Sequence, residues 1–243
     1  MTIALVTGGG SGIGQATARA LAARGARVMV ADIDEDAARA TATEIAAEAV
    51  RVDVADADSV AAMVAFTVDR LGGLDWACNI AGISPMPKPF VDHTADEWTR
   101  TIAVDLNGVF YCMQAEIRQM IAQGGGGAIV NMSSGAGLVP APGMPAYTAA
   151  KHGVLGLTKQ AAQEYARAGI RVNAVLPGQT ETAPMRAFLD MMPDHGEKML
   201  RQLPMQRMAT PDEIANAVAW LCSPEASYVN GESLVVDGGL IAR

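Results

Sequence analysis

Residues 3–25 read IALVTGGGSGIGQATARALAARG, an apolar run that leads through a glycine-rich turn into an alanine-rich segment. The unbroken run IALVT is typical of a strand buried on both faces, and the segment after the turn has the composition of a helix. Gly8, Gly12 and Gly14 stand at the junction in the spacing GxxxGxG. Glycines there permit a tight turn and let backbone N–H groups approach a pyrophosphate. The stretch predicts a dinucleotide-binding strand–turn–helix unit, with an ordinary structural turn as the alternative.

The same alternation continues along the rest of the chain. Apolar, strand-like runs end near Asp32, Val54, Gly82 and Gly178, with helix-compatible segments between them. Strands joined by helices of this length require right-handed crossovers, which produce a parallel sheet with helices on both faces. The 243 residues contain no internal repeat, linker or low-complexity tail. We therefore expect a single α/β domain over residues 1–243, a Rossmann-type doubly wound sheet of about seven strands.

Composition excludes several functional classes. The chain is 50% hydrophobic with a net charge of −8, and it has no lysine- or arginine-rich run. Nucleic acid and anionic membranes are therefore not expected as partners. A signal peptide and an apolar run of membrane-spanning length are both missing from this sequence, so we expect a cytoplasmic protein.

Cysteine and histidine give little support to metal or thiol chemistry. Each cysteine lies in an apolar context, which favours small buried side chains in a reducing compartment over reactive thiols. The histidines fall in no zinc-binding spacing, so no metal is expected. These residues are Cys78, Cys112 and Cys222, and His93, His152 and His195.

The second strand-like run ends at Asp32, 18 residues after Gly14. A carboxylate at the end of this strand can accept hydrogen bonds from both hydroxyls of an adenosine ribose, and its charge would repel a 2′-phosphate. The neighbours Ser11, Ile33 and Asp34 supply no cation. The sequence therefore favours NAD over NADP. An aspartate that caps the helix beginning near Asp34 is the alternative, and it fits either cofactor.

Other polar residues follow the third and fourth strands, at the edge where open α/β sheets bind ligands. Asp53 could accept a hydrogen bond from the adenine amine, with Val54 and Ile80 lining the adenine pocket. Ordinary turn chemistry at a strand end is an equally good interpretation of Asp53. Asn79 to Gly82 close the fourth strand.

A second decisive stretch is SGAGLVPAPGMPAYTAAK, Ser134 to Lys151. Its three prolines and three glycines exclude a continuous helix or strand before Tyr147. Tyr147 and Lys151 then stand four apart, on one face of a predicted helix. A fixed ammonium beside a phenol favours the phenolate, so the tyrosine can act as a base nearer neutral pH. The stretch predicts a proton-transfer site, although a Tyr–Lys pair is also common on a solvated helix face.

Two segments of the second half carry weaker signals. A helix-like run from Asp96 to about Gln123 contains Asn107 beside Gly108, which indicates a kink or a polar role, unless Asn107 is simply exposed.

Residues 179–210 are rich in methionine and interrupted by prolines. We expect there a mobile apolar cover over the substrate, a lid, rather than a rigid element. Methionine-rich packing or a subunit contact is the alternative.

Taken together, these motifs resemble the short-chain dehydrogenase/reductase family over nearly the whole chain. The matching pieces are TGGGSGIG at 7–14, NIAG at 79–82, Asn107, Ser134, Tyr147-x-x-x-Lys151 and PGQTET at 177–182. The resemblance implies an oxidoreductase that transfers hydride between NAD(H) and a secondary alcohol or ketone. It implies that Tyr147 is the catalytic acid/base and that Ser134, 13 positions earlier, binds the substrate oxygen. Lys151 would lower the pKa of Tyr147, and Asn107 would hold a water that links Lys151 to solvent.

The resemblance also implies two sets of ligand contacts. The substrate contacts are Ser134, Ala136, Met144 and Tyr147. The cofactor contacts are Gly8, Ser11, Gly12, Ile13, Gly14, Asp32, Asp53, Val54, Asn79, Ala81, Gly82, Tyr147, Lys151, Pro177, Gly178, Thr180 and Thr182. One position departs from the family pattern, because Thr180 stands where an aliphatic residue is usual.

The substrate expected is a small to medium apolar alcohol or ketone, alicyclic, aromatic-diol or steroid-like, because apolar residues surround the predicted site. A reductase of 3-oxoacyl thioesters on an acyl carrier protein is the alternative. Asp32 argues against it, and so does RQMIAQGGGG at 118–127, where Arg118 is the one charged residue. A non-catalytic nucleotide-sensing module is disfavoured, because Ser134, Tyr147 and Lys151 are all present. The resemblance further implies a homo-oligomer, a tetramer or else a dimer, formed through the helices after residues 96 and 146.

Overall fold

The apolar runs of the sequence form one parallel sheet. The computed structural model describes residues 1–191 and 193–242, without the side chains of 193–195 and 197. In this part of the chain the sheet has seven strands in the order β3-β2-β1-β4-β5-β6-β7. They are β1 (Ile3–Thr7), β2 (Arg27–Asp32), β3 (Glu48–Arg51), β4 (Trp76–Asn79), β5 (Gly127–Met132), β6 (Ile170–Pro177) and β7 (Ser233–Val236). The predicted Rossmann-type doubly wound sheet is confirmed.

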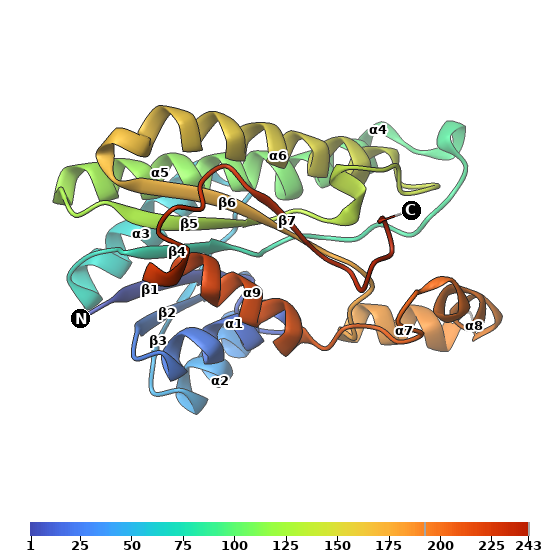
Figure 1. Cartoon of the computed structure of the whole chain (residues 1–243), viewed down its shortest axis with the longest axis horizontal. Helices are drawn as coiled ribbons and strands as arrows, with labels where there is room; N and C mark the ends of the chain where they lie inside the picture. The colour runs from blue at the N-terminus through green and yellow to red at the C-terminus, as the bar shows by residue number, and fades with distance from the viewer. Residues whose placement is uncertain (192, 243) are drawn as a thin grey trace.

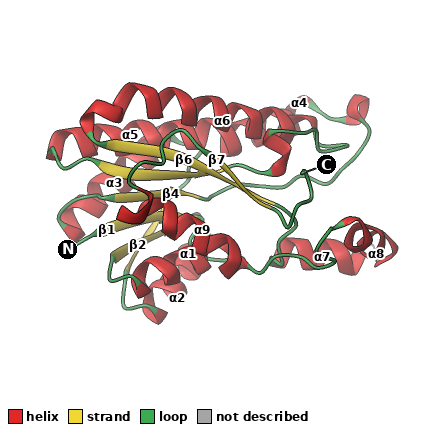
Figure 2. Cartoon of the chain, viewed as in Figure 1, coloured by secondary structure: helices red, strands yellow, loops and turns green. Residues whose placement is uncertain are grey.

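Helices cover both faces of the sheet (Figure 1, Figure 2). One layer contains α3 (Ala57–Leu71), α5 (Gly108–Gln123) and α6 (Pro145–Tyr165), whose buried residues share a core with the strands. The opposite layer contains α1 (Gly12–Ala23), α2 (Glu35–Glu44) and α9 (Pro211–Cys222), which form a second core. Two-sided burial explains why the strands read as unbroken apolar runs. None of the described helices is long and apolar enough to cross a membrane.

The predicted long helix after residue 96 is interrupted. It consists of α4 (Ala95–Ile102), a π-helical turn (Ala103–Asn107) and α5. Gly108 begins α5 against Val54, since a Cβ on Gly108 would lie 3.0 Å from Val54 Cγ2 and 3.1 Å from its carbonyl oxygen. The glycine therefore permits close packing, and the irregularity expected at Asn107 is the π turn just before it.

Residues 179–210, which the sequence predicts as a mobile apolar cover, contain helical structure. They form two helices, α7 (Ala183–Met191) and α8 (Pro193–Gln202), which extend from one end of the sheet (Figure 1). Two of the prolines that suggested a broken segment, Pro184 and Pro193, fall in the first turns of these helices. A first helical turn tolerates proline, because its N–H groups have no partner within the helix.

The carboxyl ends of the central strands lie side by side. The strand register aligns Thr7 with Asn79, and Asn79 with Asn131. The hydroxyl oxygen of Thr7 accepts hydrogen bonds from the N–H groups of Ile80 and Ala81, at 3.1 and 3.3 Å. This contact holds the turn after β1 against the turn after β4 and so defines the edge where the predicted site residues gather.

Candidate active site

The glycine turn between β1 and α1 has no room for side chains. Gly8 and Gly12 have positive φ angles of 69° and 52°. A Cβ on Gly8 would lie 2.9 Å from Ala81 Cα, and one on Gly14 would overlap the carbonyl oxygen of Gly8. Ser11 precedes α1 and its side chain makes no capping hydrogen bond. The first amides of α1 therefore lack a side-chain cap, and this bare turn fits the pyrophosphate of a dinucleotide.

Asp32 is fixed at the rim of this turn. Its Oδ2 accepts a hydrogen bond from the Gly10 N–H at 2.9 Å, and its Oδ1 accepts one from the Asp34 N–H at 3.0 Å. The N-cap of α2 is Asp34, whose carboxylate accepts from the Ala37 N–H. Asp32 is therefore not needed as the cap, and its oxygens keep lone pairs for a ribose.

Arg51 lies beside Asp32 in the sheet, since the two residues are aligned across β2 and β3. Both are open to solvent, Arg51 more so than the half-buried Asp32. Arg51 is 19 residues from Asp32 in the sequence, so only the pairing of β2 with β3 brings this cation beside the carboxylate.

The residues at the ends of β3 and β4 have structural partners. Asp53 Oδ1 accepts from the Ala55 N–H at 3.0 Å, which is the turn chemistry given above as an alternative. Asn79 points into the interior, where its Nδ2 donates to Glu116 Oε2 and Asn131 Oδ1, both at 3.0 Å. An adenosine contact through the side chain of Asn79 is thus not supported, whereas the backbone of Ala81 and Gly82 borders the glycine turn and Lys151.

Tyr147 and Lys151 lie on one face of α6, as predicted. The Lys151 Nζ lies 5.4 Å from the centroid of the Tyr147 ring. It donates a hydrogen bond to the Met132 carbonyl oxygen at 3.2 Å, and only 3% of Lys151 is exposed. This is a buried ammonium beside a half-buried phenol, not a solvated helix face.

The two adjacent serines after β5 have different environments. Ser133 is buried and its Oγ donates to the Lys151 carbonyl oxygen at 3.0 Å. Ser134 is half-buried, and its Oγ accepts from the Ala136 N–H at 3.1 Å while keeping its own proton to donate. The geometry therefore agrees with Ser134 as the substrate-facing serine. Ala136 is only 7% exposed, and Met144 is half-buried just before α6.

Asn107 is not brought to Lys151. It ends the π turn with its side chain exposed. The same turn instead carries Asp105, which is fully buried, with Oδ1 3.5 Å from Lys151 Nζ. Asp105 Oδ1 also accepts from the Ile83 N–H at 3.0 Å. Sequence reasoning missed Asp105, although an acid within the apolar run VDLNGVF was a usable signal, because a buried carboxylate requires a partner.

Burial raises the pKa of Asp105, and the attraction of the Lys151 ammonium together with the Ile83 hydrogen bond lowers it. Asp105 and Lys151 therefore form one buried ion pair, located where the loop after β4 meets α6.

No group of three or more histidine, cysteine or acidic side chains that could hold a metal occurs among the described residues.

The segment Pro177–Thr182 lies over the glycine turn. A Cβ on Gly12 would lie 3.3 Å from Thr182 Cγ2, and one on Gly178 would lie 2.8 Å from Asp237. Thr180 is buried, and its Oγ1 donates to the Gly178 carbonyl oxygen at 3.1 Å. This hydroxyl bond stabilises the turn at the one position that departs from the family pattern.

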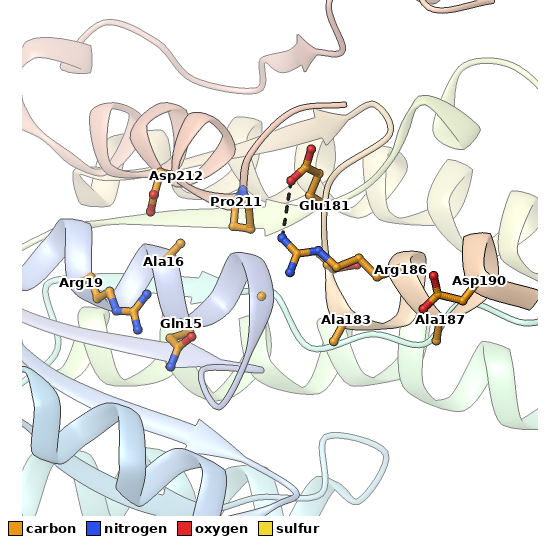
Figure 3. Close-up of a pocket in the computed structure, with 12 residues that line it drawn as sticks. Gln15, Ala16, Arg19, Glu181, Ala183, Arg186, Ala187, Asp190, Pro211 and Asp212 are labelled. Atoms are coloured by element: carbon orange, nitrogen blue, oxygen red, sulfur yellow. Dashed lines mark hydrogen bonds and ion pairs between the residues drawn. The ribbon is translucent and has the colours of Figure 1, made fainter. Parts of the chain in front are cut away.

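Two surface grooves flank these elements. A groove of about 550 Å³ lies between α1, α7 and the start of α9 and includes Gly12, Thr182 and Arg186, which is ion-paired with Glu181 at 3.5 Å (Figure 3). A second groove of about 480 Å³ is almost entirely apolar and includes Phe90 and Met144. The lining of neither groove includes Tyr147 or Lys151.

The chain is similar to known proteins along nearly its whole length. A family model described as enoyl-(acyl carrier protein) reductase matches residues 8–241. A short chain dehydrogenase/reductase, astE of Aspergillus oryzae, is 43% identical, over 98% of this chain and 94% of the relative. A cyclohexanol dehydrogenase of Acinetobacter sp. is 42% identical, over 99% of this chain and 95% of the relative. The crystal structure of gox2181 superposes with a TM-score of 0.96 at 34% identity, over 100% and 96% of the two chains.

Proposed function

The chain belongs to the short-chain dehydrogenase/reductase family, and from that premise we propose that it interconverts an apolar, alicyclic secondary alcohol and its ketone with NAD(H). The observation that carries this proposal is the buried Lys151 ammonium 5.4 Å from the Tyr147 ring. A phenol beside a fixed cation can exchange a proton with a substrate hydroxyl near neutral pH.

The proposed chemistry divides between three side chains. In the oxidation direction Tyr147 takes the proton of the substrate hydroxyl, because Lys151 stabilises the phenolate that receives it. Ser134 donates its hydroxyl proton toward the substrate oxygen and orients it. A nicotinamide bound there would supply the hydride acceptor for oxidation and the hydride donor for the reverse reaction. The glycine turn, Asp32 and the Pro177–Thr182 segment would hold the cofactor.

Apolar surroundings support an alicyclic substrate. Large apolar side chains are exposed on the loops that follow β4 and β5, with 53% of Met86, 46% of Leu138 and 42% of Val139 accessible. Exposed apolar patches commonly mark ligand sites. The cyclohexanol dehydrogenase relative takes a substrate of this chemistry. We further propose that α7 and α8 close over the substrate as a lid.

A second candidate is the reductase of 3-oxoacyl thioesters, favoured by the carrier-protein substrate in the description of the family model. An acidic carrier protein would be recognised by a basic surface. The segment that leads into β5, residues 118–127, contains Arg118 as its one cation. A 3-oxoacyl thioester in the same reductase assay as cyclic ketones separates the two candidates.

Tyr147→Phe tests the proposal directly. The substitution keeps the ring and removes the hydroxyl, so turnover of cyclic alcohols should fall by at least about 1,000-fold, at the upper range of general acid–base contributions. NADH binding, followed by fluorescence titration, should change less than about threefold. Appreciable remaining turnover would contradict the assignment of Tyr147 as the acid/base. Tyr165→Phe, on a half-buried tyrosine at the far end of α6, is the matched control.

We also propose a cytoplasmic homo-oligomer. All three cysteines are buried as free thiols, as expected for a reducing compartment. Large apolar side chains are exposed along α4 and α5, among them Trp98, Phe110 and Ile121. These side chains would be buried if the helices packed against a second copy of the chain.

A further inference from the structure

Asp105 is a buried carboxylate with one oxygen in use. It is fully buried in the π turn, and its Oδ1 lies 3.0 Å from the Ile83 N–H and 3.5 Å from Lys151 Nζ. Its Oδ2 is buried and has no hydrogen-bond partner among the described residues. A buried carboxylate in this state requires a compensating charge. That charge is the ammonium of Lys151.

The surrounding backbone is built around this carboxylate. A Cβ on Gly82 would lie 2.6 Å from Asp105 Oδ1 and 3.5 Å from Lys151 Nζ, so a residue with a side chain could not occupy this position without displacing the pair. The π turn adds a residue to the helix between α4 and α5, and such turns occur frequently at functional sites. Gly82 and the π turn therefore act together to bring an acid to Lys151.

Few charged groups face this pair. The π turn contacts α4, α5 and α6, and it meets the loop after β4 through Ile83. From α6 it faces Lys151 and, beyond the ammonium, the Tyr147 ring. The charge that lowers the pKa of the Asp105 carboxyl is that of Lys151, and the loop contributes the Ile83 N–H. The described residues thus place the Lys151 ammonium between the Tyr147 ring and the Asp105 carboxylate.

We propose that Asp105 is a positioning residue: its carboxylate holds the Lys151 ammonium beside Tyr147 and sets the pH at which the Tyr–Lys pair gives up its proton. A negative charge next to two groups that lose protons delays both losses, so its removal moves both to lower pH. A neutral side chain of the same shape would hold Lys151 without this effect. The predicted change in the pH dependence of kcat/KM rests on the proposed function. The effect of the Asp105 charge on proton loss from Tyr147 and Lys151 does not.

The test is Asp105→Asn, which preserves the side-chain shape and an oxygen that can accept from the Ile83 N–H. The acid limb of kcat/KM for alcohol oxidation should move down by about one pH unit. Asp96→Asn, which removes an exposed carboxylate from α4, should leave that limb within about 0.2 unit, because solvent screens an exposed charge. A lower kcat with an unshifted acid limb, or an upward shift, would overturn the proposal and leave Asp105 a structural role.

A second readout needs no substrate. The ultraviolet absorbance of tyrosinate is titrated with pH in the otherwise native protein and in Tyr147→Phe, and the difference isolates Tyr147. Tyr147 should ionise at a lower pH in the Asp105→Asn background, and identical titrations would refute the charge effect. Because this measurement is independent of turnover, an enzyme inactive on every alcohol would defeat the proposed function alone. If Asp105→Asn fails to fold, Asp105→Ser removes the same charge and should shift the titration in the same direction.

Discussion

At the scale of single residues, two aspartates illustrate how environment assigns a role. Asp32 is half-buried and fixed by two backbone N–H groups at the rim of the glycine turn. Asp105 is fully buried and faces one cation. The first keeps lone pairs at the rim of the glycine turn and suits ligand recognition, whereas the second suits control of a neighbouring charge.

Asp32 gives a test of cofactor choice. The wild-type protein should show a kcat/KM with NAD at least about 100-fold above that with NADP, because two hydrogen bonds from ribose hydroxyls to a carboxylate are worth about 3 kcal/mol or more. Asp32→Ser should remove most of this preference in steady-state kinetics.

Asp34→Ala is the matched control for that experiment. It removes the N-cap of α2 and should lower stability by about 1 kcal/mol while leaving the NAD preference intact. Equal kcat/KM values with NAD and NADP in the wild type would contradict the role of Asp32 and direct attention to Arg51, its neighbour on β3.

Motifs with a fixed spacing predicted which residues gather at the candidate site. Ser134 was predicted as the substrate-binding serine from its separation from Tyr147, and its neighbour Ser133 is hydrogen-bonded to the Lys151 carbonyl oxygen. Spacing did not lead to Asp105. An Asn beside a Gly suggested the irregular point of the helix, but only the π turn decides which residue of VDLNG faces inward. A one-residue change of helical phase is not visible in a hydrophobic pattern.

At the scale of elements, a buried polar network joins β4, β5, α5 and α6. Asn79 bridges Glu116 and Asn131, and Asn131 also donates to Thr158 Oγ1 at 3.0 Å. Glu116 is fully buried on α5, and its Oε1 has no partner among the described residues. Burial raises the pKa of Glu116 to about 7, opposed by the hydrogen bond from Asn79. The glutamate therefore opposes folding increasingly as the pH rises from its unfolded to its folded pKa, and by a constant amount above the folded pKa.

Glu116→Gln should consequently stabilise the protein in a pH-dependent manner. Below the unfolded pKa of 4.5 the glutamate is protonated in both states, so the variant should gain little. Between 4.5 and about 7 the wild type should lose stability as pH rises, and above about 7 the difference should level off at up to about 3 kcal/mol. Urea unfolding at several pH values measures this difference.

The control for Glu116 is Glu44→Gln, on an exposed glutamate paired with Arg19. An exposed ion pair contributes little, so this variant should follow the wild type at every pH. A constant stability difference between Glu116→Gln and the wild type from pH 5 to pH 8 would show that Glu116 does not titrate in this range.

Element types were predictable where the apolar period was long and poorly predictable where prolines intervened. The strand ending at Asp32 and the helix of residues 145–165 lie close to where the sequence placed them. In contrast, the segment that contains α7 and α8 was interpreted as a mobile cover rather than a rigid element, because a proline breaks a helix in its interior but is tolerated in its first turn. The local sequence alone does not distinguish these two positions.

At the scale of the whole molecule, the sheet was predictable because its central strands repeat one rule. These strands are buried on both faces and are therefore largely apolar, whereas the edge strands β3 and β7 are only partly buried. The intervening helices fix the parallel direction. The pattern could not predict which side chains from distant parts of the sequence contact each other. Cys78 on β4 and Cys222 on α9 are 144 residues apart, and their Sγ atoms lie 3.6 Å from each other.

The assembly proposal is tested by a solution mass. Light scattering should give a tetramer or else a dimer of the 25.2 kDa chain, and a monomer at micromolar concentration would refute it. Phe110→Asp, on the exposed face of α5, should shift the mass downward because it places a charge in the expected interface. Tyr228→Asp changes another exposed aromatic, outside α4, α5 and α6, and should leave the mass unchanged.

The central position of β1 has a consequence for the order in which the chain can mature on the ribosome. β1 lies between β2 and β4, and Thr7 and Gly8 contact Ile80 and Ala81, more than 70 residues later in synthesis. The glycine turn therefore remains incomplete until β4 has emerged, and pairings of such separation form slowly. A nicotinamide cofactor would consequently stabilise the finished sheet and could not guide the assembly of its first two strands.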